Sequence, residues 1–380
     1  MVRFKTHMFR ENTGRNATLV TALAAGAIAA ALATAPVAHA AEYNVTGLGF
    51  LSGGSNSRAA GINASGQVVG YSDTSSGATH AFLYSGGTMQ DLGTLGGSAS
   101  FAEGINASGQ VVGYSDTSAG DPHAFLYGAG AMQDLGTLGG PYSYASAINA
   151  SGQVVGYSDT SAGNPHAFLF SAGAMQDLGT LGGPYSYGVG INDSGQVAAS
   201  AATSSNAAHS FLYNGVTKQD LGTLPGGSYT TAYAMNASGQ VVGNASTSSG
   251  ATHAFLYSGG AIQDLGTLVG GSLSFAYGIN DSGQVVGNAN TGSSGGDAYL
   301  YSGGVMQDLN SLIPAASGWA LTQATAINNL GDIVGYGTDP QGNTEAFLLT
   351  PTAVPEPAPL ALMAIAGAGI LLLRKRRSRA

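Results

Sequence analysis

The sequence lacks cysteine and holds few charged residues of either sign. Its 380 residues include no Cys, 11 Lys or Arg and 20 Asp or Glu, so only 8% of the chain is charged. Without cysteine no disulfide can stabilise the fold, and stability must come from packing of secondary structure. The missing thiols say little about the redox compartment.

Basic residues are almost absent from the central part of the chain. Nine of the 11 lie in the first 40 residues or after residue 373, which leaves Arg58 and Lys218 between residues 41 and 354. The same segment carries 18 acidic residues, a net charge of −16 with neutral histidines. Because such a domain repels phosphate backbones, we do not expect nucleic acid as a partner.

Helical periodicity is missing too, and a repeat takes its place. The pattern apolar-Asn-x-x-Gly occurs seven times, at spacings of 43, 43, 43, 44, 44 and 48 residues. In the unit at residues 101–138, short runs at 104–106, 110–114, 123–127 and 132–138 are separated by turn residues, which predicts four short strands. Units of roughly 40–45 residues with four strands are typical of the blades of a β-propeller.

The ends of the repeat region indicate how a ring would close. The first six units end in a Gln-Asp-Leu strand, whereas the seventh stops at residues 345–349 without one, and a degenerate copy lies at residues 43–51. We therefore expect an all-β, seven-bladed propeller over residues 41–351, with repeats of about 43 residues, closed by the N-terminal strand. An open β-array is the alternative, but the polar capping repeats of solenoids are missing.

Residues 1–40 are typical of a secretory signal peptide. Four basic residues precede an uncharged run at 17–35, and Ala38-His39-Ala40 forms a small-residue cleavage signal. We expect cleavage between Ala40 and Ala41. A retained transmembrane helix is the alternative, which the mild hydropathy of the run disfavours.

Residues 352–380 contain a second targeting pattern. Pro355-Glu356-Pro357 precedes an uncharged run at 358–373 and a basic cluster at 374–377. The run would span about 24 Å as a helix, shorter than a ~30 Å hydrocarbon core. This segment resembles the PEP-CTERM sorting signal. That resemblance implies a polysaccharide-producing Gram-negative bacterium, a short transmembrane helix held transiently in the inner membrane, and recognition by an exosortase with removal of the tail.

Five histidines open equivalent His-Ala-Phe-Leu or His-Ser-Phe-Leu strands. They are His80, His123, His166, His209 and His253. The pattern resembles the HAF-repeat family of bacterial extracellular proteins over about residues 43–351. The resemblance implies an exported repeat protein and carries no defined activity.

Each histidine precedes an aspartate of the fourth strand by 11 residues. These aspartates are Asp91, Asp134, Asp177, Asp220 and Asp264, and Asp308 follows Asp297 at the same distance. A two-residue hairpin at Gly86-Gly87 pairs Phe82 with Asp91 and places His80 diagonally across from Asp91, within reach of a hydrogen bond. We therefore predict structural His–Asp pairs. A shared metal is the alternative, but each unit offers one His and no Cys.

No cofactor and no catalytic residue are predicted. The loops at Asp73, Asp116 and Asp159 each hold one carboxylate, which at most suits weak calcium binding. Residues unique to one unit fall in different units, with no spacing that indicates convergence on an active site. They are Arg58, Glu103, Lys218, Trp319 and the segment 339–345.

Tyrosines recur near one corner of several units. They are Tyr142, Tyr144, Tyr185, Tyr187, Tyr229 and Tyr233, and they suit either sugar stacking or packing between blades. We expect a non-catalytic, exosortase-sorted protein of the cell surface or extracellular matrix that binds glycan or protein. Its export partners would be signal peptidase and an exosortase. The alternatives are a purely structural matrix protein and an extracellular polysaccharide-active enzyme.

Overall fold

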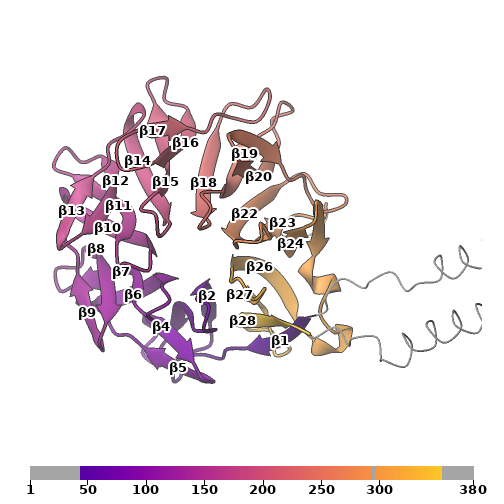
Figure 1. Cartoon of the computed structure of the whole chain (residues 1–380). Helices are drawn as coiled ribbons and strands as arrows, with labels where there is room; N and C mark the ends of the chain where they lie inside the picture. Colours follow the sequence, from indigo (N-terminus) through magenta and orange to yellow (C-terminus); the bar gives the residue numbers. More distant parts are fainter. Residues whose placement is uncertain (1–42, 293–295, 353–380) are drawn as a thin grey trace, which may run out of the picture. The chain divides into compact units, whose positions relative to one another are not determined.

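The described chain is a ring of seven small β-sheets. The computed structural model describes residues 43–292 and 296–352. Twenty-eight strands in this part form seven antiparallel four-stranded sheets, arranged as blades around an axis (Figure 1). The predicted seven-bladed β-propeller is thus confirmed. No helix of the described ranges is long and apolar enough to cross a membrane, and the expected signal peptide and the segment 358–373 lie outside them.

Within each of the first six blades the strands follow chain order from the axis outward (Figure 1). The first strands of blades one to six are β2 (Ser57–Ile62), β6 (Gly96–Ile105), β10 (Gly139–Ile148), β14 (Gly182–Ile191), β18 (Thr230–Met235) and β22 (Ser274–Ile279). The second strands are β3 (Val68–Asp73), β7 (Val111–Thr117), β11 (Val154–Thr160), β15 (Val197–Thr203), β19 (Val241–Ser246) and β23 (Val285–Ala289).

The outer half of these six blades is built the same way. The third strands are β4 (Thr79–Ser85), β8 (Pro122–Gly128), β12 (Pro165–Ser171), β16 (Ala208–Tyr213), β20 (Thr252–Ser258) and β24 (Asp297–Ser302). The fourth strands are β5 (Thr88–Asp91), β9 (Ala131–Asp134), β13 (Ala174–Asp177), β17 (Lys218–Asp220), β21 (Ala261–Asp264) and β25 (Val305–Asp308). Two 3₁₀ turns follow, η1 (Leu309–Ser311) and η2 (Ala315–Ser317).

The seventh blade joins the two ends of the ring. It contains β26 (Ala320–Ile327), β27 (Ile333–Thr338), β28 (Thr344–Pro351) and, as its outermost strand, β1 (Tyr43–Gly47). β1 pairs antiparallel with β28, with Tyr43 opposite Pro351 and Gly47 opposite Phe347. The predicted closure by the N-terminal strand is confirmed, and the open array is excluded.

Strand lengths differ from those predicted. In the second blade β6 begins at Gly96, eight residues before the predicted run, and β9 ends at Asp134 rather than at residue 138. The carboxylate of Asp134 accepts a hydrogen bond from the Gly136 amide at 2.7 Å, and Gly136 has a φ of 74°. This local turn ends the fourth strand and directs Leu135, which is buried, into the core between blades.

Small residues let the two inner strands of a blade pack on a buried aromatic ring. Phe168 of the third strand is fully buried, and a Cβ on Gly156 of the second strand would collide with the backbone carbonyl of Tyr144. Gly156 therefore faces Ala145 across the strand pair. In the fourth blade the order is reversed, since Ala199 faces Gly188. A small residue on each of the two strands keeps them close enough to cover the buried phenylalanine side chain.

Hydroxyl groups connect neighbouring blades. The Ser143 hydroxyl accepts a hydrogen bond from the Ala124 amide at 2.8 Å and donates to the Gly136 carbonyl at 2.6 Å, both in the preceding blade. Ser57 makes the same bridge to Ala346 and Gly49 across the closing interface. Ser57 and Ser143 are fully buried, so these bridges satisfy backbone groups that water cannot reach.

Candidate functional site

The predicted His–Asp hydrogen bonds are present in five blades. The Nδ1 atom of each histidine lies 2.8 or 2.9 Å from an aspartate oxygen. In the first blade Phe82 pairs with Asp91, as the hairpin geometry required. The histidine side chains are 22–23% exposed and those of the aspartates 40–44%. The pairs belong to the two outer strands, away from the channel, and tie these strands together at a partly exposed edge.

The sixth and seventh blades replace the pair with other contacts. Asp297 accepts a hydrogen bond from the Thr291 hydroxyl, and Asp308 caps η1 by accepting from the Asn310 amide. Glu345 accepts from the Gly49 amide at 2.7 Å. Burial raises the pKa of Glu345, and the neighbouring Asp339 carboxyl adds to this. Among the described residues no three metal-ligating side chains gather in one place.

One end of the channel is lined by a circle of asparagine side chains. The Asn106 side-chain amide donates to the Asn149 carbonyl of the next blade at 3.1 Å and to Gln110 Oε1 at 2.8 Å. Its Oδ1 accepts from the Ser108 and Gln110 amides. The members of this asparagine ring are buried: Asn63, Asn106, Asn149, Asn192, Asn236, Asn280 and Asn328. Their amides are saturated, so the ring is a structural element.

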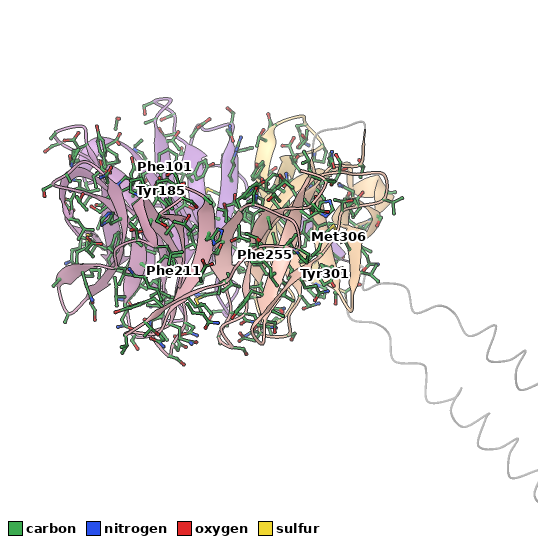
Figure 2. The ribbon with its side chains drawn as sticks, turned by 90° about the horizontal axis from the view of Figure 1, so that it is seen from above. Phe101, Tyr185, Phe211, Phe255, Tyr301 and Met306 are labelled. Atoms are coloured by element: carbon green, nitrogen blue, oxygen red, sulfur yellow. The ribbon has the colours of Figure 1, made fainter. Side chains whose placement is uncertain are left out.

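An aromatic belt runs along the opposite mouth of the channel over four of the seven blades. Rings from the first and second strands alternate from blade one to blade four: Tyr71, Phe101, Tyr114, Tyr144, Tyr157 and Tyr187. Contacts between blades are edge-to-face and contacts within a blade are stacked, with centroids 4.8–5.0 Å apart. Phe101 and Tyr185, which contacts Tyr187, lie toward the same face of the ring (Figure 2).

Arg58 and Glu103 line one cavity at this aromatic mouth, although their spacing in the sequence does not indicate that they converge. The cavity has a volume of about 400 Å³. Its other side chains include Tyr71, Tyr233, Tyr277, Gln323, Thr325 and Tyr336. The Arg58 guanidinium carbon lies 4.4 Å from the centroid of the Tyr336 ring. Lys218, Trp319 and the segment 339–345 do not line it. Arg58 and Glu103 come together although they belong to different units, because the first strands of all blades surround the axis (Figure 1).

A smaller pocket opens beside this cavity between the second and third blades. It has a volume of about 250 Å³ and is lined by Glu103, Tyr114, Tyr144, Tyr157, Ala145 and Ser146. Removal from bulk water raises the pKa of Glu103 to about 7. Burial raises the pKa of Tyr157 to about 12, with the neighbouring Tyr144 and Glu103 contributing. Carboxyl and phenol groups therefore crowd together without a compensating positive charge.

The seven blades differ from one another where they face the channel. The residue two positions before the conserved apolar residue of the repeat is different in nearly every blade: Ala60, Glu103, Ser146, Val189, Tyr233, Tyr277 and Thr325. That apolar residue itself is Ile in six copies and Met in one. Since the copies share one fold, the scaffold does not dictate these side chains. The channel mouth is thus where a sevenfold repeat acquires a unique surface.

Acidic residues cluster on the face that carries the aromatic belt. The second and fourth strands end at this face, and aspartates stand at or near their ends. These include Asp73, Asp116, Asp159 and the six aspartates of the fourth strands. At the opposite face, the turns after the first strands carry Asp193, Asp281 and Asp332. The belt face therefore has the more negative potential, which attracts cations toward the mouth.

The tyrosines predicted near one corner do not share one role. Tyr144 and Tyr187 belong to the aromatic belt, and Tyr233 lines the cavity. The Tyr229 hydroxyl is hydrogen-bonded to the Thr252 hydroxyl at 2.7 Å, which is a packing contact. Tyr142 is 40% exposed near the start of β10. Sequence alone could not separate these roles, because all of these tyrosines lie in a first strand or directly before one.

Comparison with known proteins supports the fold. No protein-family model and no curated protein matches the sequence. The β-propeller domain of the Trilobed protease from Pyrococcus furiosus matches with a TM-score of 0.53 and 8% identity, over 80% of this chain and 100% of that one. A puromycin-hydrolyzing peptidase from Mycobacterium tuberculosis matches with a TM-score of 0.53 and 13% identity, over 80% of this chain and 54% of its own.

TolB from Acinetobacter baumannii also matches, with a TM-score of 0.45 and 11% identity, over 75% of this chain and 63% of that one. The match spans less than two thirds of TolB and of the peptidase. At these identities the likeness shows the fold alone. The chain is a β-propeller scaffold built from seven repeats.

Proposed function

We propose that this protein is an exported, non-catalytic binding propeller of the cell surface or extracellular matrix, which takes a glycan at the aromatic mouth. The observation that carries the proposal is the cavity of about 400 Å³ lined by Arg58, Glu103 and several tyrosines. Small-molecule sites are typically 300–1,000 Å³ and combine aromatic walls with a few polar groups. The hydroxyls of Tyr233 and Tyr277 have no protein partner within the described residues and are available to a sugar.

Export and sorting rest on the two ends of the sequence. The pattern at Ala38–Ala40 supports cleavage before Ala41, and Pro355-Glu356-Pro357 with the run at 358–373 supports processing by an exosortase. The ends lie outside the described residues. The resemblance to a sorting signal of polysaccharide-producing bacteria makes matrix glycan the natural ligand class for a channel mouth of this chemistry.

A catalytic alternative has one observation in its favour, the pKa of about 7 for Glu103. A carboxyl group with a pKa near neutrality suits general acid or base catalysis. Glycoside hydrolysis usually needs two carboxyl groups, about 5–9.5 Å apart. Among the described residues that line the cavity, Glu103 supplies the one carboxyl group. Binding is therefore the better-supported function.

A glycan array with the purified full-length chain tests the proposal. Tyr233→Ala removes a wall of the cavity, whereas Tyr142→Ala removes an exposed tyrosine of β10 that does not line the cavity. We expect the first change to weaken glycan binding about tenfold, or roughly 1.4 kcal/mol, and the second to leave it unchanged. Loss of binding in Tyr142→Ala alone would place the site at the exposed start of β10, outside the cavity. Hydrolysis of a matrix polysaccharide that ceases in Glu103→Gln would establish the enzyme instead.

A further inference from the structure

We propose that the pocket formed by Glu103, Tyr114, Tyr144 and Tyr157 binds the protonated amine of an amino sugar. The inference rests on the proposed glycan binding at the aromatic mouth and names the class of sugar. Three tyrosine rings and one carboxyl group line about 250 Å³ beside the main cavity. Aromatic rings grouped around an anionic side chain are the usual recognition site for organic ammonium groups.

The tyrosine rings are fixed in place by one another. Tyr144 stacks on Tyr157 with centroids 4.8 Å apart and meets Tyr114 edge-to-face at 4.9 Å. Each ring keeps some solvent-accessible surface, since all three are half-buried. A cation within about 6 Å of a ring centroid is attracted by the π-electrons, and this attraction grows where water is excluded. The walls are thus arranged before any ligand arrives.

Glu103 lacks a counter-charge in the protein. Within the described residues no hydrogen bond or ion pair engages its carboxyl group. Arg58 lies over the Tyr336 ring, and the Lys218 ammonium donates to the Thr180 carbonyl at 3.0 Å in the outer part of the ring. Burial without a partner is what raises the pKa of Glu103. A bound ammonium group would supply the missing charge and favour the carboxylate.

The charge distribution outside the pocket favours the same ligand. The belt face carries most of the acidic residues, so a cationic glycan is drawn to the mouth and an anionic one is repelled. Glu103 is the one carboxylate among the seven equivalent channel-facing positions. The expected stoichiometry is therefore one amine site per chain.

The adjoining cavity distinguishes an amino sugar from a lysine side chain. It offers the hydroxyls of Tyr233 and Tyr277 and the aromatic faces of Tyr71 and Tyr336. A pyranose ring can place its hydroxyl groups against the phenols of Tyr233 and Tyr277 and its C–H groups against the other two rings. The aliphatic stem of lysine would leave the phenols unpaired, which costs binding free energy.

Titration of the full-length chain with two matched oligosaccharides tests the inference. One is a glucosamine tetramer with free amines, and the other is the same tetramer fully N-acetylated. We expect the free-amine tetramer to bind with a stoichiometry of one, and more weakly as salt increases. Glu103→Gln should weaken it by roughly tenfold or more, while Asp73→Asn, which removes a carboxylate from the same face, should change it by less than about threefold.

The possible outcomes separate this inference from the proposed function. Equal affinity for both tetramers, or full affinity in Glu103→Gln, overturns the amine site. Binding of neutral or acidic glycans that depends on Tyr233 but not on Glu103 overturns the amine site and retains glycan binding. A trilysine peptide that binds in a Glu103-dependent way, when the free-amine tetramer does not, shows a protein amine as the ligand and refutes the amino sugar. No binding of any glycan refutes both.

Discussion

The side-chain amide of Asn328 donates a hydrogen bond to the backbone carbonyl of Asn63 at 3.2 Å, across 265 residues of sequence. This bond joins the seventh blade to the first and completes the circle of seven asparagine side chains. Equivalent bonds between neighbouring blades span 43–48 residues. The ring is therefore closed twice, by β1 at the rim and by the asparagine ring at the axis.

Breaking one link of the asparagine ring should destabilise the fold. Asn149 is buried, donates to Gln153 Oε1 and the Asn192 carbonyl, and accepts from the Gln153 amide. We expect Asn149→Ala to lower the free energy of unfolding by about 1–3 kcal/mol, because buried partners lose their hydrogen bonds. Urea unfolding measures it, with the exposed Ser151→Ala as control. If Asn149→Ala lowers the free energy of unfolding no more than the control does, this link of the asparagine ring does not stabilise the fold.

Removing the N-terminal strand should open the seventh blade. Deletion of residues 43–51 exposes the edge of β28 and removes Leu48 and Leu51, which are buried against the first and seventh blades. We expect aggregation and a fall in melting temperature of roughly 5 °C or more. Light scattering during thermal melts measures both. Thr46→Ala, an exposed change in the same strand, should behave as the wild type, and an unchanged melt after the deletion would contradict closure by β1.

The His–Asp pairs should matter less than the hydroxyl bridges. His123→Ala removes a partly exposed pair, so we expect a loss of less than about 1 kcal/mol. Ser143→Ala leaves the buried Ala124 amide and Gly136 carbonyl without partners, and should cost about 1–3 kcal/mol. Both values come from denaturant unfolding. The reverse order of the two losses would show that the histidine edge, and not the bridge between blades, is the stronger contact.

Glu103 should make stability depend on pH. Its pKa is about 7 in the fold and near the ordinary value of 4.5 in the unfolded chain. Between these pH values the folded state holds the extra proton, so stability is full below pH 4.5 and falls as pH rises toward 7. Compared with Glu103→Gln, the wild type should lose about 1–3 kcal/mol over this window. Denaturant unfolding of both proteins at several pH values measures this loss. The same pH dependence of the unfolding free energy in both proteins would contradict the assignment.

The sorting tail gives a prediction that is independent of the ring. We expect the mature surface protein to end near Pro355-Glu356-Pro357, because a short apolar run followed by basic residues suits a transient membrane intermediate. Replacing the three residues by alanine should leave uncut precursor in the inner membrane. Mass spectrometry of the surface fraction decides the matter, since peptides from residues 358–373 in it would indicate a permanent anchor.

The sequence by itself determined the architecture of the ring. The repeat spacing set the number of blades, turn residues set the strands, and the degenerate copy at residues 43–51 indicated how the seventh blade is completed. The offset between His80 and Asp91 predicted their hydrogen bond because a two-residue hairpin fixes strand register. These inferences rest on local geometry, which the order of residues encodes directly.

Only the tertiary structure decided which of the residues that differ between repeats lie together. Glu103 occupies the position equivalent to Ala60, and the ring brings that position into one cavity with Arg58 and with tyrosines from other blades. Aligning the repeats would have shown that this position is variable, but not which way it faces. Strand direction, the twist of each blade and closure of the ring decide which side chains share the axis, and these depend on contacts between residues hundreds of positions apart.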